Sequence, residues 1–210
     1  MPRRSAADAA LTRIALLDSA RLCFVADGYA ATTTQAIAAR AGCSQSALFH
    51  HFADKTEIFE QVVAEAVKQY DLGVREAAIA ATGGPLGGFL AGCQRSLQLA
   101  SDPAWSRLVA VDAPAVLGPD RLHYIDADLG LTTTGYGLRL LVRAGVLAAD
   151  TDTAALALVV YGALTSAAFE FARTSAEPIT GPAPGRPDVD RVMRVIERLI
   201  EAHRNTPSDA

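Results

Sequence analysis

The sequence predicts an all-α protein: an N-terminal three-helix helix-turn-helix domain followed by a larger helical domain. Half of the 210 residues are hydrophobic, and the abundance of Ala and Leu favours helix over strand. Apolar residues recur at helical spacing along the chain, and no stretch alternates as strands do. Two of the predicted N-terminal helices are joined by a very tight turn at Gly42, which is the pattern of a helix-turn-helix.

A first helix is predicted from an apolar face that ends before Gly28. The residues of this face lie three or four positions apart, as neighbours on one side of a helix do: Ala10, Ile14, Leu17, Ala20 and Phe24. Gly28 can adopt the left-handed conformation that ends a helix. We therefore expect the chain to turn at this glycine.

The next two helices are predicted from their capping residues. Thr32 and Gln35 have capping-box spacing, which predicts a helix over residues 33–41 that stops at Gly42. Ser44 can cap a short third helix. These two helices, with the turn between them, complete the first domain, which we predict to span residues 1–54.

The remaining residues, 55–204, are predicted to form one helical domain. Asp54 and Glu57 have the cap-plus-three spacing that opens a long helix toward residue 80. Further helices are predicted over about 86–100, 103–112, 119–144, 152–173 and 188–204. The proline- and glycine-rich segment 174–187 is predicted to be a loop, and residues 205–210 a disordered tail.

Charge is distributed unevenly between the two predicted domains. The net charge of −4 and pI near 5.5 argue, taken alone, against a nucleic-acid partner. Residues 1–55, however, hold six Arg or Lys and four Asp, a net of +2, which leaves −6 for the remainder. Such asymmetry in charge indicates that the two parts of the chain have different roles.

The cysteines and the apolar segments favour a soluble protein of the cytoplasm. Cys23, Cys43 and Cys93 are scattered without a CxxC motif, which is typical of reduced thiols. The most apolar segment, residues 154–169, is shorter than the about 20 residues that span a bilayer. We therefore predict a buried helix there and no membrane partner.

The stretch SQSALFHHF at residues 44–52 combines two histidines with two phenylalanines. Successive residues of a helix point about 100° apart, so His50 and His51 are poorly placed to share a metal ion. No Ser or Cys lies in a recognisable catalytic motif, and we predict no metal site, no catalytic residue and no cofactor. Leu48 and Phe52 are four apart and are predicted to pack in the core.

A second face of this short helix suits DNA. Gln45, Ser46, Phe49 and His50 gather there, because they are three or four positions apart. Glutamine can bond the edge of adenine through two groups, and a small serine lets a helix approach the groove closely. His50 and Ser44 can donate to phosphates. The alternative interpretation is a solvated helix face with a half-buried phenylalanine.

These residues belong to a longer run that resembles the DNA-binding region of the TetR/AcrR family of bacterial transcriptional regulators. Residues 28–44, GYAATTTQAIAARAGCS, and 47–55, ALFHHFADK, carry the resemblance. It implies phosphate contacts near helix N-termini from Thr34 and Ser44, base contacts from Gln45, Ser46 and Ala47, backbone contacts from Phe49, His50 and His51, and a phosphate contact from Lys55.

The sequence departs from the family pattern at two of these positions. The family usually has tyrosine where Phe49 stands, so the bond from that hydroxyl to phosphate is missing. It often has glycine where Ser46 stands, which changes how deeply the helix enters the groove.

The resemblance also implies a homodimer with a four-helix interface between two subunits. Six residues of the last two predicted helices are compatible with such an interface: Ala163, Ala167, Val192, Val195, Ile196 and Leu199. The alternative is that these apolar residues pack within one subunit.

Regulators of this kind enclose a small-molecule pocket in the larger domain. Ten apolar or aromatic residues are candidates to line it: Phe89, Cys93, Leu97, Trp105, Leu108, Tyr124, Tyr136, Leu140, Tyr161 and Phe169. Five residues are candidates for polar contacts: Gln94, Asp112, Arg121, His123 and Asp126.

We therefore expect a repressor that a small, largely apolar ligand releases from a double-stranded DNA operator. One alternative is a helical protein-interaction module that retains the helix-turn-helix without binding DNA, which the acidic total favours. The other is an α-helical enzyme, for which His123 and Asp126 are the one candidate acid–base pair.

Overall fold

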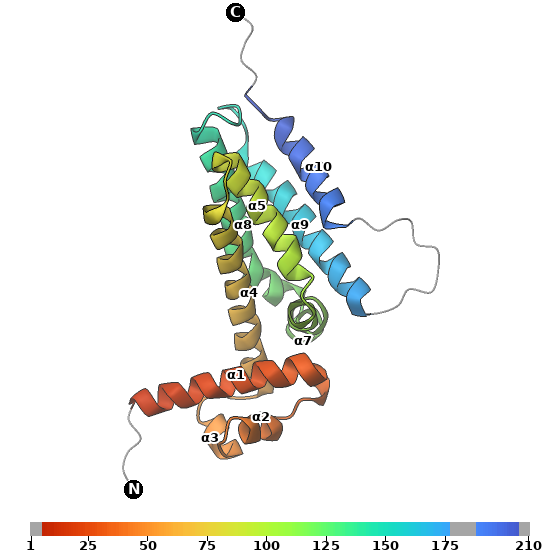
Figure 1. Ribbon diagram of the computed structural model, residues 1–210. Coiled ribbons are helices and arrows are strands. Elements are labelled where there is room, and N and C mark those ends of the chain that lie inside the picture. Colours follow the sequence, from red (N-terminus) through yellow and green to blue (C-terminus); the bar gives the residue numbers. More distant parts are fainter. Residues whose placement is uncertain (1–5, 177–187, 206–210) are drawn as a thin grey trace, which may run out of the picture.

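The computed structural model describes residues 6–176 and 188–205. Apart from turns and an isolated β-bridge between Leu147 and Arg204, the secondary structure of these residues is helical, which confirms the predicted all-α fold. Figure 1 shows three helices lying across one end of the molecule and a long helix rising from them beside a bundle.

We call the first three helices the head. They are α1 (Ala6–Ala31), α2 (Thr34–Arg40) and α3 (Gln45–Phe49). The long helix is α4 (Lys55–Ala80). The elements after it form the body: α5 (Gly84–Ala100), α6 (Pro103–Trp105), the π-helix η1 (Ser106–Asp112), α7 (Ala113–Leu117), α8 (Pro119–Arg143), α9 (Thr153–Ala176) and α10 (Val189–Glu201).

The body differs from the prediction in two places. The α-helix expected over 103–112 is the short α6 followed by a π-helix, a wider form that occurs frequently at functional sites. Helix α9 continues to Ala176, three residues into the predicted loop. The rest of that loop, residues 177–187, and the predicted tail from residue 206 lie outside the described residues.

Two predicted caps are confirmed. The Ser44 hydroxyl accepts a hydrogen bond from the Ala47 N–H at 3.1 Å and begins α3. The Asp54 carboxylate accepts from the Glu57 N–H at 2.8 Å and begins α4. Each cap satisfies a backbone donor that the first turn of a helix leaves unpaired.

The cap of α2 is not the residue that the sequence predicted. Thr33, rather than Thr32, accepts from the Ala36 N–H at 3.1 Å. Thr32 is buried, and its hydroxyl donates to the Gly28 carbonyl at 2.7 Å. Both threonines thus stabilise the turn between α1 and α2, one at each end.

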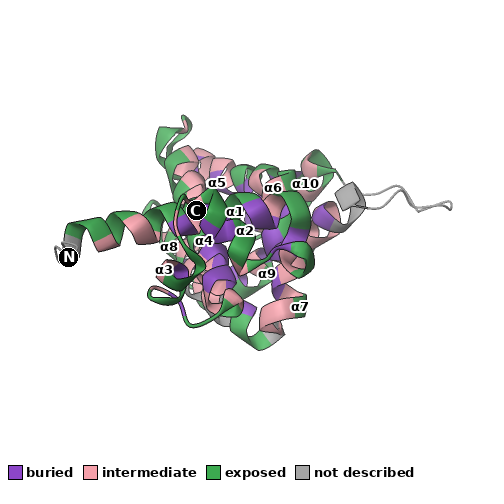
Figure 2. Cartoon of the chain, turned by 90° about the horizontal axis from the view of Figure 1, so that it is seen from below, coloured by how far each residue is buried: buried purple, intermediate pink, exposed green. Residues whose placement is uncertain are grey.

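Helix α1 packs through a face slightly rotated from the predicted one. Ala20 and Phe24 are buried as expected, and Leu16 joins them. Ile14, in contrast, is 56% exposed, and Ala10 is exposed too. The reason is visible in Figure 2, where the first turns of α1 project beyond the rest of the molecule and have little to pack against.

An apolar core crosses the predicted domain boundary at residues 54 and 55. Phe24 of the head meets Phe59 of α4 edge to face, with ring centroids 5.0 Å apart. The same cluster of buried residues includes Leu108 and Val109 of η1 and Ala113 of α7. The head is therefore packed on the body through α4 and η1 rather than joined to it by a flexible linker.

Polar contacts reinforce this packing where α1 ends. The Asp112 carboxylate of η1 accepts from the Tyr29 N–H at 2.9 Å and from Arg107 at 3.3 Å. Arg107 also donates to the Asp27 carbonyl at 3.4 Å. Gly28 adopts φ 76°, ψ 170°, a conformation essentially restricted to glycine, and a Cβ there would lie 1.8 Å from the Arg107 guanidinium.

Lys55 completes this arrangement from α4. Its ammonium donates to the carbonyls of Tyr29 at 2.9 Å and Thr32 at 3.0 Å, and lies 4.1 Å from the centre of the Tyr29 ring. Together, Gly28, Tyr29, Lys55, Arg107 and Asp112 form what we call the junction. It fixes the turn that leads into the helix-turn-helix.

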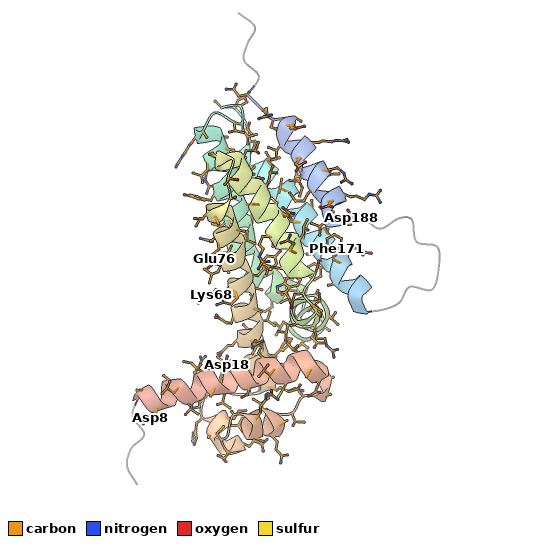
Figure 3. The ribbon with its side chains drawn as sticks, viewed as in Figure 1. Asp8, Asp18, Lys68, Glu76, Phe171 and Asp188 are labelled. Carbon is orange, nitrogen blue, oxygen red and sulfur yellow. The ribbon has the colours of Figure 1, made fainter. Side chains whose placement is uncertain are left out.

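We expect Lys55→Ala to lower the free energy of unfolding by about 1.5–3 kcal/mol, because hydrogen bonds to a charged group contribute about that much. Lys68→Ala is the matched control. Lys68 lies on the outer side of α4 (Figure 3) and pairs with Glu65 at 3.8 Å on the surface, so its loss should cost less than about 1 kcal/mol. Urea denaturation of both variants measures the difference, and equal losses would contradict the structural role of Lys55.

Candidate functional site

Helix α3 occupies the end of the head that faces away from the body (Figure 1). Leu48 and Phe52 are buried, as predicted, and anchor the helix. Gln45 and Ser46 of the same helix are exposed to solvent, and Phe49 is 47% exposed. The body therefore leaves this face of the helix open to a large partner.

The predicted DNA-contacting residues differ in how accessible they are. Four of them are half-buried, namely Thr34, Ala47, His51 and Lys55, whereas Ser44, Gln45, Ser46, Phe49 and His50 are exposed. All nine lie on or beside the helix-turn-helix. The structure thus brings the whole predicted set together at one end of the molecule.

Gln45 already has a polar partner within the protein. Its side-chain amide donates to the Thr34 hydroxyl at 2.9 Å, which connects the start of α3 to the start of α2. The bond orients the glutamine along the outer surface of the head. The side-chain NH2 has a second N–H, which together with the amide oxygen can still bond the edge of a base.

Lys55 is the residue whose environment the sequence did not reveal. Its ammonium has three N–H donors, and two of them bind the carbonyls of the junction. One donor is left for a phosphate, so the predicted phosphate contact stays a prediction. The sequence predicted a turn at Gly28, but the helical spacing of residues did not show that the turn would direct these two carbonyls toward Lys55.

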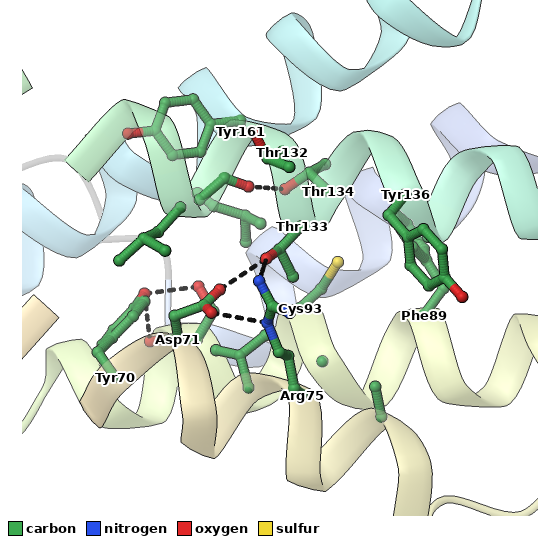
Figure 4. Close-up of a pocket in the computed structure, with 18 of the residues that line it drawn as sticks. Tyr70, Asp71, Arg75, Phe89, Cys93, Thr132, Thr133, Thr134, Tyr136 and Tyr161 are labelled. Carbon is green, nitrogen blue, oxygen red and sulfur yellow. Dashed lines mark hydrogen bonds and ion pairs between the residues drawn. The ribbon is translucent and has the colours of Figure 1, made fainter. Parts of the chain in front are cut away.

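A cavity of about 520 Å³ lies in the body, between α4, α5, α8 and α9 (Figure 4). Seven of the predicted lining residues surround it: Phe89, Cys93, Trp105, Tyr136, Leu140, Tyr161 and Phe169. Leu97 and Leu108 are instead buried in the apolar cores and do not line the cavity. The side chain of Tyr124 lies outside those described.

The predicted polar contacts of the cavity are wrong where the structure describes them. Gln94 lines a separate surface hollow beside α10. Asp112 belongs to the junction, and Arg121 pairs with Glu60. The side chains of His123 and Asp126, which include the acid–base pair of the enzyme alternative, lie outside those described.

The charged residues described in the cavity wall come mainly from α4, from which the sequence predicted no lining residue. Arg75 donates to the Asp71 carboxylate at 2.7 Å and to the Thr133 hydroxyl at 2.9 Å. The Thr133 hydroxyl in turn donates to the other Asp71 oxygen at 2.7 Å (Figure 4). Asp71 and Arg75 are four positions apart on a helix, and this spacing is the sequence feature that could have indicated their ion pair.

Two further groups in the cavity wall bear on its chemistry. Burial raises the pKa of the Cys93 thiol to about 12, so this cysteine is a neutral, apolar wall element and not a nucleophile. The indole N–H of Trp105 is buried without a hydrogen-bond partner among the described residues. Trp105 stacks on Tyr70 with ring centroids 5.3 Å apart.

Helix α9 is not the buried helix that the sequence predicted. Residues 153–172 have a mean hydropathy of 1.6, yet only 28% of that window is buried. By length and composition alone this segment could span a membrane, but an apolar helix that packs against protein meets the same criterion. One side of it is exposed along its length, at Ala155, Leu158, Val159, Gly162, Ala163 and Ser166, which we call the α9 outer face.

The predicted interface residues divide between this surface and the core. Ala163 belongs to the α9 outer face, and Val195 of α10 is 65% exposed. Ala167, Val192 and Leu199 are half-buried. Ile196, however, is only 2% exposed and belongs to the core of its own subunit, so its assignment to an interface is wrong.

Comparison with known proteins places the two parts of the chain in one family. Residues 16–62 match the description "Bacterial regulatory proteins, tetR family", and residues 86–203 match "Tetracyclin repressor-like, C-terminal domain". The HTH-type transcriptional repressor AcnR of Corynebacterium jeikeium is 34% identical over 69 residues, 33% of this chain and 36% of that protein. A repressor of Mycobacterium tuberculosis is 36% identical over 87 residues, 41% of this chain and 43% of that protein.

These curated relatives are thus matched over less than half of their length, whereas solved structures are matched nearly throughout. A TetR-family transcriptional regulator of Pectobacterium atrosepticum is 30% identical, with a TM-score of 0.77 over 97% of this chain and 100% of the other. The fatty acid degradation regulator FadR of Bacillus halodurans shares the fold at 14% identity, with a TM-score of 0.68 over 95% of this chain and 96% of the other. The chain therefore belongs to the TetR family of bacterial regulatory proteins.

Proposed function

We propose that the chain is a cytoplasmic transcriptional repressor that binds a double-stranded DNA operator as a homodimer and leaves it when a small molecule occupies the body cavity. The observation that carries the DNA-binding part is that Gln45 and Ser46 are exposed on α3, the helix at the end of the head that faces away from the body (Figure 1). A helix presented in this way can enter the major groove and contact base edges.

The residues around this face divide into two roles. Gln45, Ser46 and Ala47 meet bases, and Thr34 and Ser44 meet phosphates beside the groove. Phosphate contacts fix the position of a protein on the duplex, and base contacts select the sequence. The net charge of +2 on residues 1–55 favours this end of the acidic chain as the one that approaches DNA.

We expect Gln45→Ala to weaken operator binding by about 1–3 kcal/mol and to relax the choice of base at one position. Gln98→Ala, an exposed glutamine on α5, is the matched control and should bind as the unaltered protein does. A mobility-shift titration against DNA upstream of the protein's own gene, and against single-base variants of the bound site, measures both effects. Absence of any shift would favour the protein-interaction module instead.

A second copy of the chain is the partner proposed for the α9 outer face. A lone helix-turn-helix reads one half-site, and a dimer reads two half-sites one helical turn or more apart. Leu158, Val159 and Val195 expose apolar surface, while Gly162 and Ala163 present almost no side chain, so two backbones can approach closely. A two-fold axis through this face places it against the same face of the second subunit.

We expect Leu158→Arg to weaken the dimer by about 2 kcal/mol or more, because it places a charge without a partner in an apolar interface. Leu158 is 62% exposed in the single chain, so the subunit itself should still fold. Leu22→Arg makes the same exchange on the exposed side of α1 and should leave the dimer intact. Sedimentation equilibrium distinguishes the two results, and an unchanged dimer in Leu158→Arg would exclude the α9 outer face.

The ligand response is proposed from the position of η1 between the cavity and the head. Val109 of η1 lines the cavity, and Asp112, at the end of the same seven-residue element, holds Tyr29. A ligand that binds best when the heads do not fit the operator lowers the affinity for DNA. Coupling of this kind typically amounts to about 1–3 kcal/mol.

We expect Asp112→Ala to lower operator affinity by about 0.5–2 kcal/mol although the residue is remote from α3, because the Tyr29 N–H loses its acceptor and the head is held less firmly. The salt dependence of binding should not change, since no phosphate contact is removed. Asp120→Ala, an exposed aspartate on α8, is the control. DNA titrations at several salt concentrations test this, and unaltered affinity would show that the junction does not position the head.

A further inference from the structure

We propose that the cavity binds a monoanionic amphiphile, an apolar molecule with one carboxylate or a similar planar anion, and that Arg75 receives the anion. This inference rests on the proposed ligand response and specifies its ligand class. Three observations support this ligand class: an oriented guanidinium with open donors and an excess of positive charge favour an anion, and a buried N–H donor without an acceptor favours a ligand that carries an oxygen.

Arg75 is held in a fixed orientation. Its Nε donates to one Asp71 oxygen at 2.7 Å and its Nη2 to the Thr133 hydroxyl at 2.9 Å. A guanidinium has five N–H donors, so these two bonds leave three, including both on Nη1. The edge formed by Nη1 and Nη2 can therefore receive both oxygens of a carboxylate in the two-bond geometry that arginine favours.

The charge of the cavity wall is positive. Among the described lining residues, the charged side chains are Asp71, Arg75 and Arg139, which gives a formal net charge of +1. The Asp71 carboxylate is buried, and its two oxygens already accept from Arg75 and Thr133. A cationic ligand would thus meet an occupied carboxylate and two arginines, whereas an anion would meet open donors.

The rest of the wall suits an apolar body. Val67, Val74, Phe89 and Leu164 line the cavity, and the neutral thiol of Cys93 adds no charge. Cavities of this size and composition bury most of the surface of a small ligand. The apolar part of the wall and the cluster of Asp71, Arg75 and Thr133 (Figure 4) therefore match a molecule with an apolar body and one charged end.

Trp105 provides the third observation. Its indole N–H is buried and has no acceptor among the described residues, and the residue lines the cavity. An unpaired buried donor is costly, and a ligand oxygen would pair it. An alcohol oxygen could satisfy this donor as well as a carboxylate oxygen could, so the preference for an anion rests on Arg75 and on the charge of the wall.

The test uses three probes with the same alkyl chain: dodecanoate and dodecylammonium, each below its micelle concentration, and dodecanol, below its solubility limit. Trp105 is the single tryptophan of the chain and lies in the cavity wall, so its fluorescence reports binding directly in the full-length protein. We expect dodecanoate to bind about tenfold or more tightly than dodecanol, the ratio that hydrogen bonds to a charged group produce. Dodecylammonium should bind more weakly than either.

Three variants identify the group responsible. Arg75→Gln should reduce dodecanoate affinity about tenfold and leave dodecanol affinity unchanged. Arg95→Gln, an exposed arginine of α5 outside the cavity wall, should change neither. Asp71→Asn should raise dodecanoate affinity, because it removes the one carboxylate among the described lining residues. A merely structural role for the pair would instead make Arg75→Gln and Asp71→Asn lose binding alike.

The proposal is overturned if dodecanol or dodecylammonium binds as tightly as dodecanoate, if none of the three binds, or if Asp71→Asn and Arg75→Gln shift dodecanoate affinity in the same direction. Operator release is measured separately by mobility shift with the same probes. Selective binding of dodecanoate without release of DNA would support the ligand class and contradict the proposed function, so the two failures are distinguishable.

Discussion

The hydrogen bond from the Tyr29 N–H to the Asp112 carboxylate joins the turn at the end of α1 to η1 of the body. Tyr29 lies directly after the glycine at which α1 turns, and its carbonyl accepts from Lys55 of α4. One residue thus connects the head, the long helix and the body. Arg107 covers Gly28 so closely that a side chain there would collide with it. The direction in which α3 points is therefore set by groups that lie outside the helix-turn-helix.

This arrangement places the junction and the cavity on either side of one short element. Within η1, Val109 faces the cavity and Arg107 and Asp112 hold the end of α1. A π-helix has a wider turn than an α-helix and often marks a functional site. Packed elements tend to shift between discrete arrangements rather than deform gradually. A change in the position of η1 would thus act on the end of α1 through the bonds of Asp112 to Tyr29 and of Arg107 to Asp27.

Local features were predictable from the sequence, and contacts between distant segments were not. The all-α fold and the caps at Ser44 and Asp54 follow from spacing over a few residues, and the structure confirms them. The partners of Lys55 lie 23 and 26 positions away, and Thr133 lies 62 positions from Asp71. Helical periodicity also shows that a residue lies on an apolar face of its helix, but it does not show what that face packs against. The core position of Ile196 could therefore not be separated from an interface position.

The charged cluster of the cavity is better explained by recognition than by folding. Asp71 is largely buried, but the Arg75 side chain is 49% exposed, so the pair resembles a partly solvated ion pair, which contributes little to stability. Apolar residues of similar volume would often serve the fold as well or better. A guanidinium held between a carboxylate and a hydroxyl is nevertheless suited to the anion that we propose for the cavity. The guanidinium is already oriented by these two bonds, so an anion can bind it without the cost of ordering a mobile side chain.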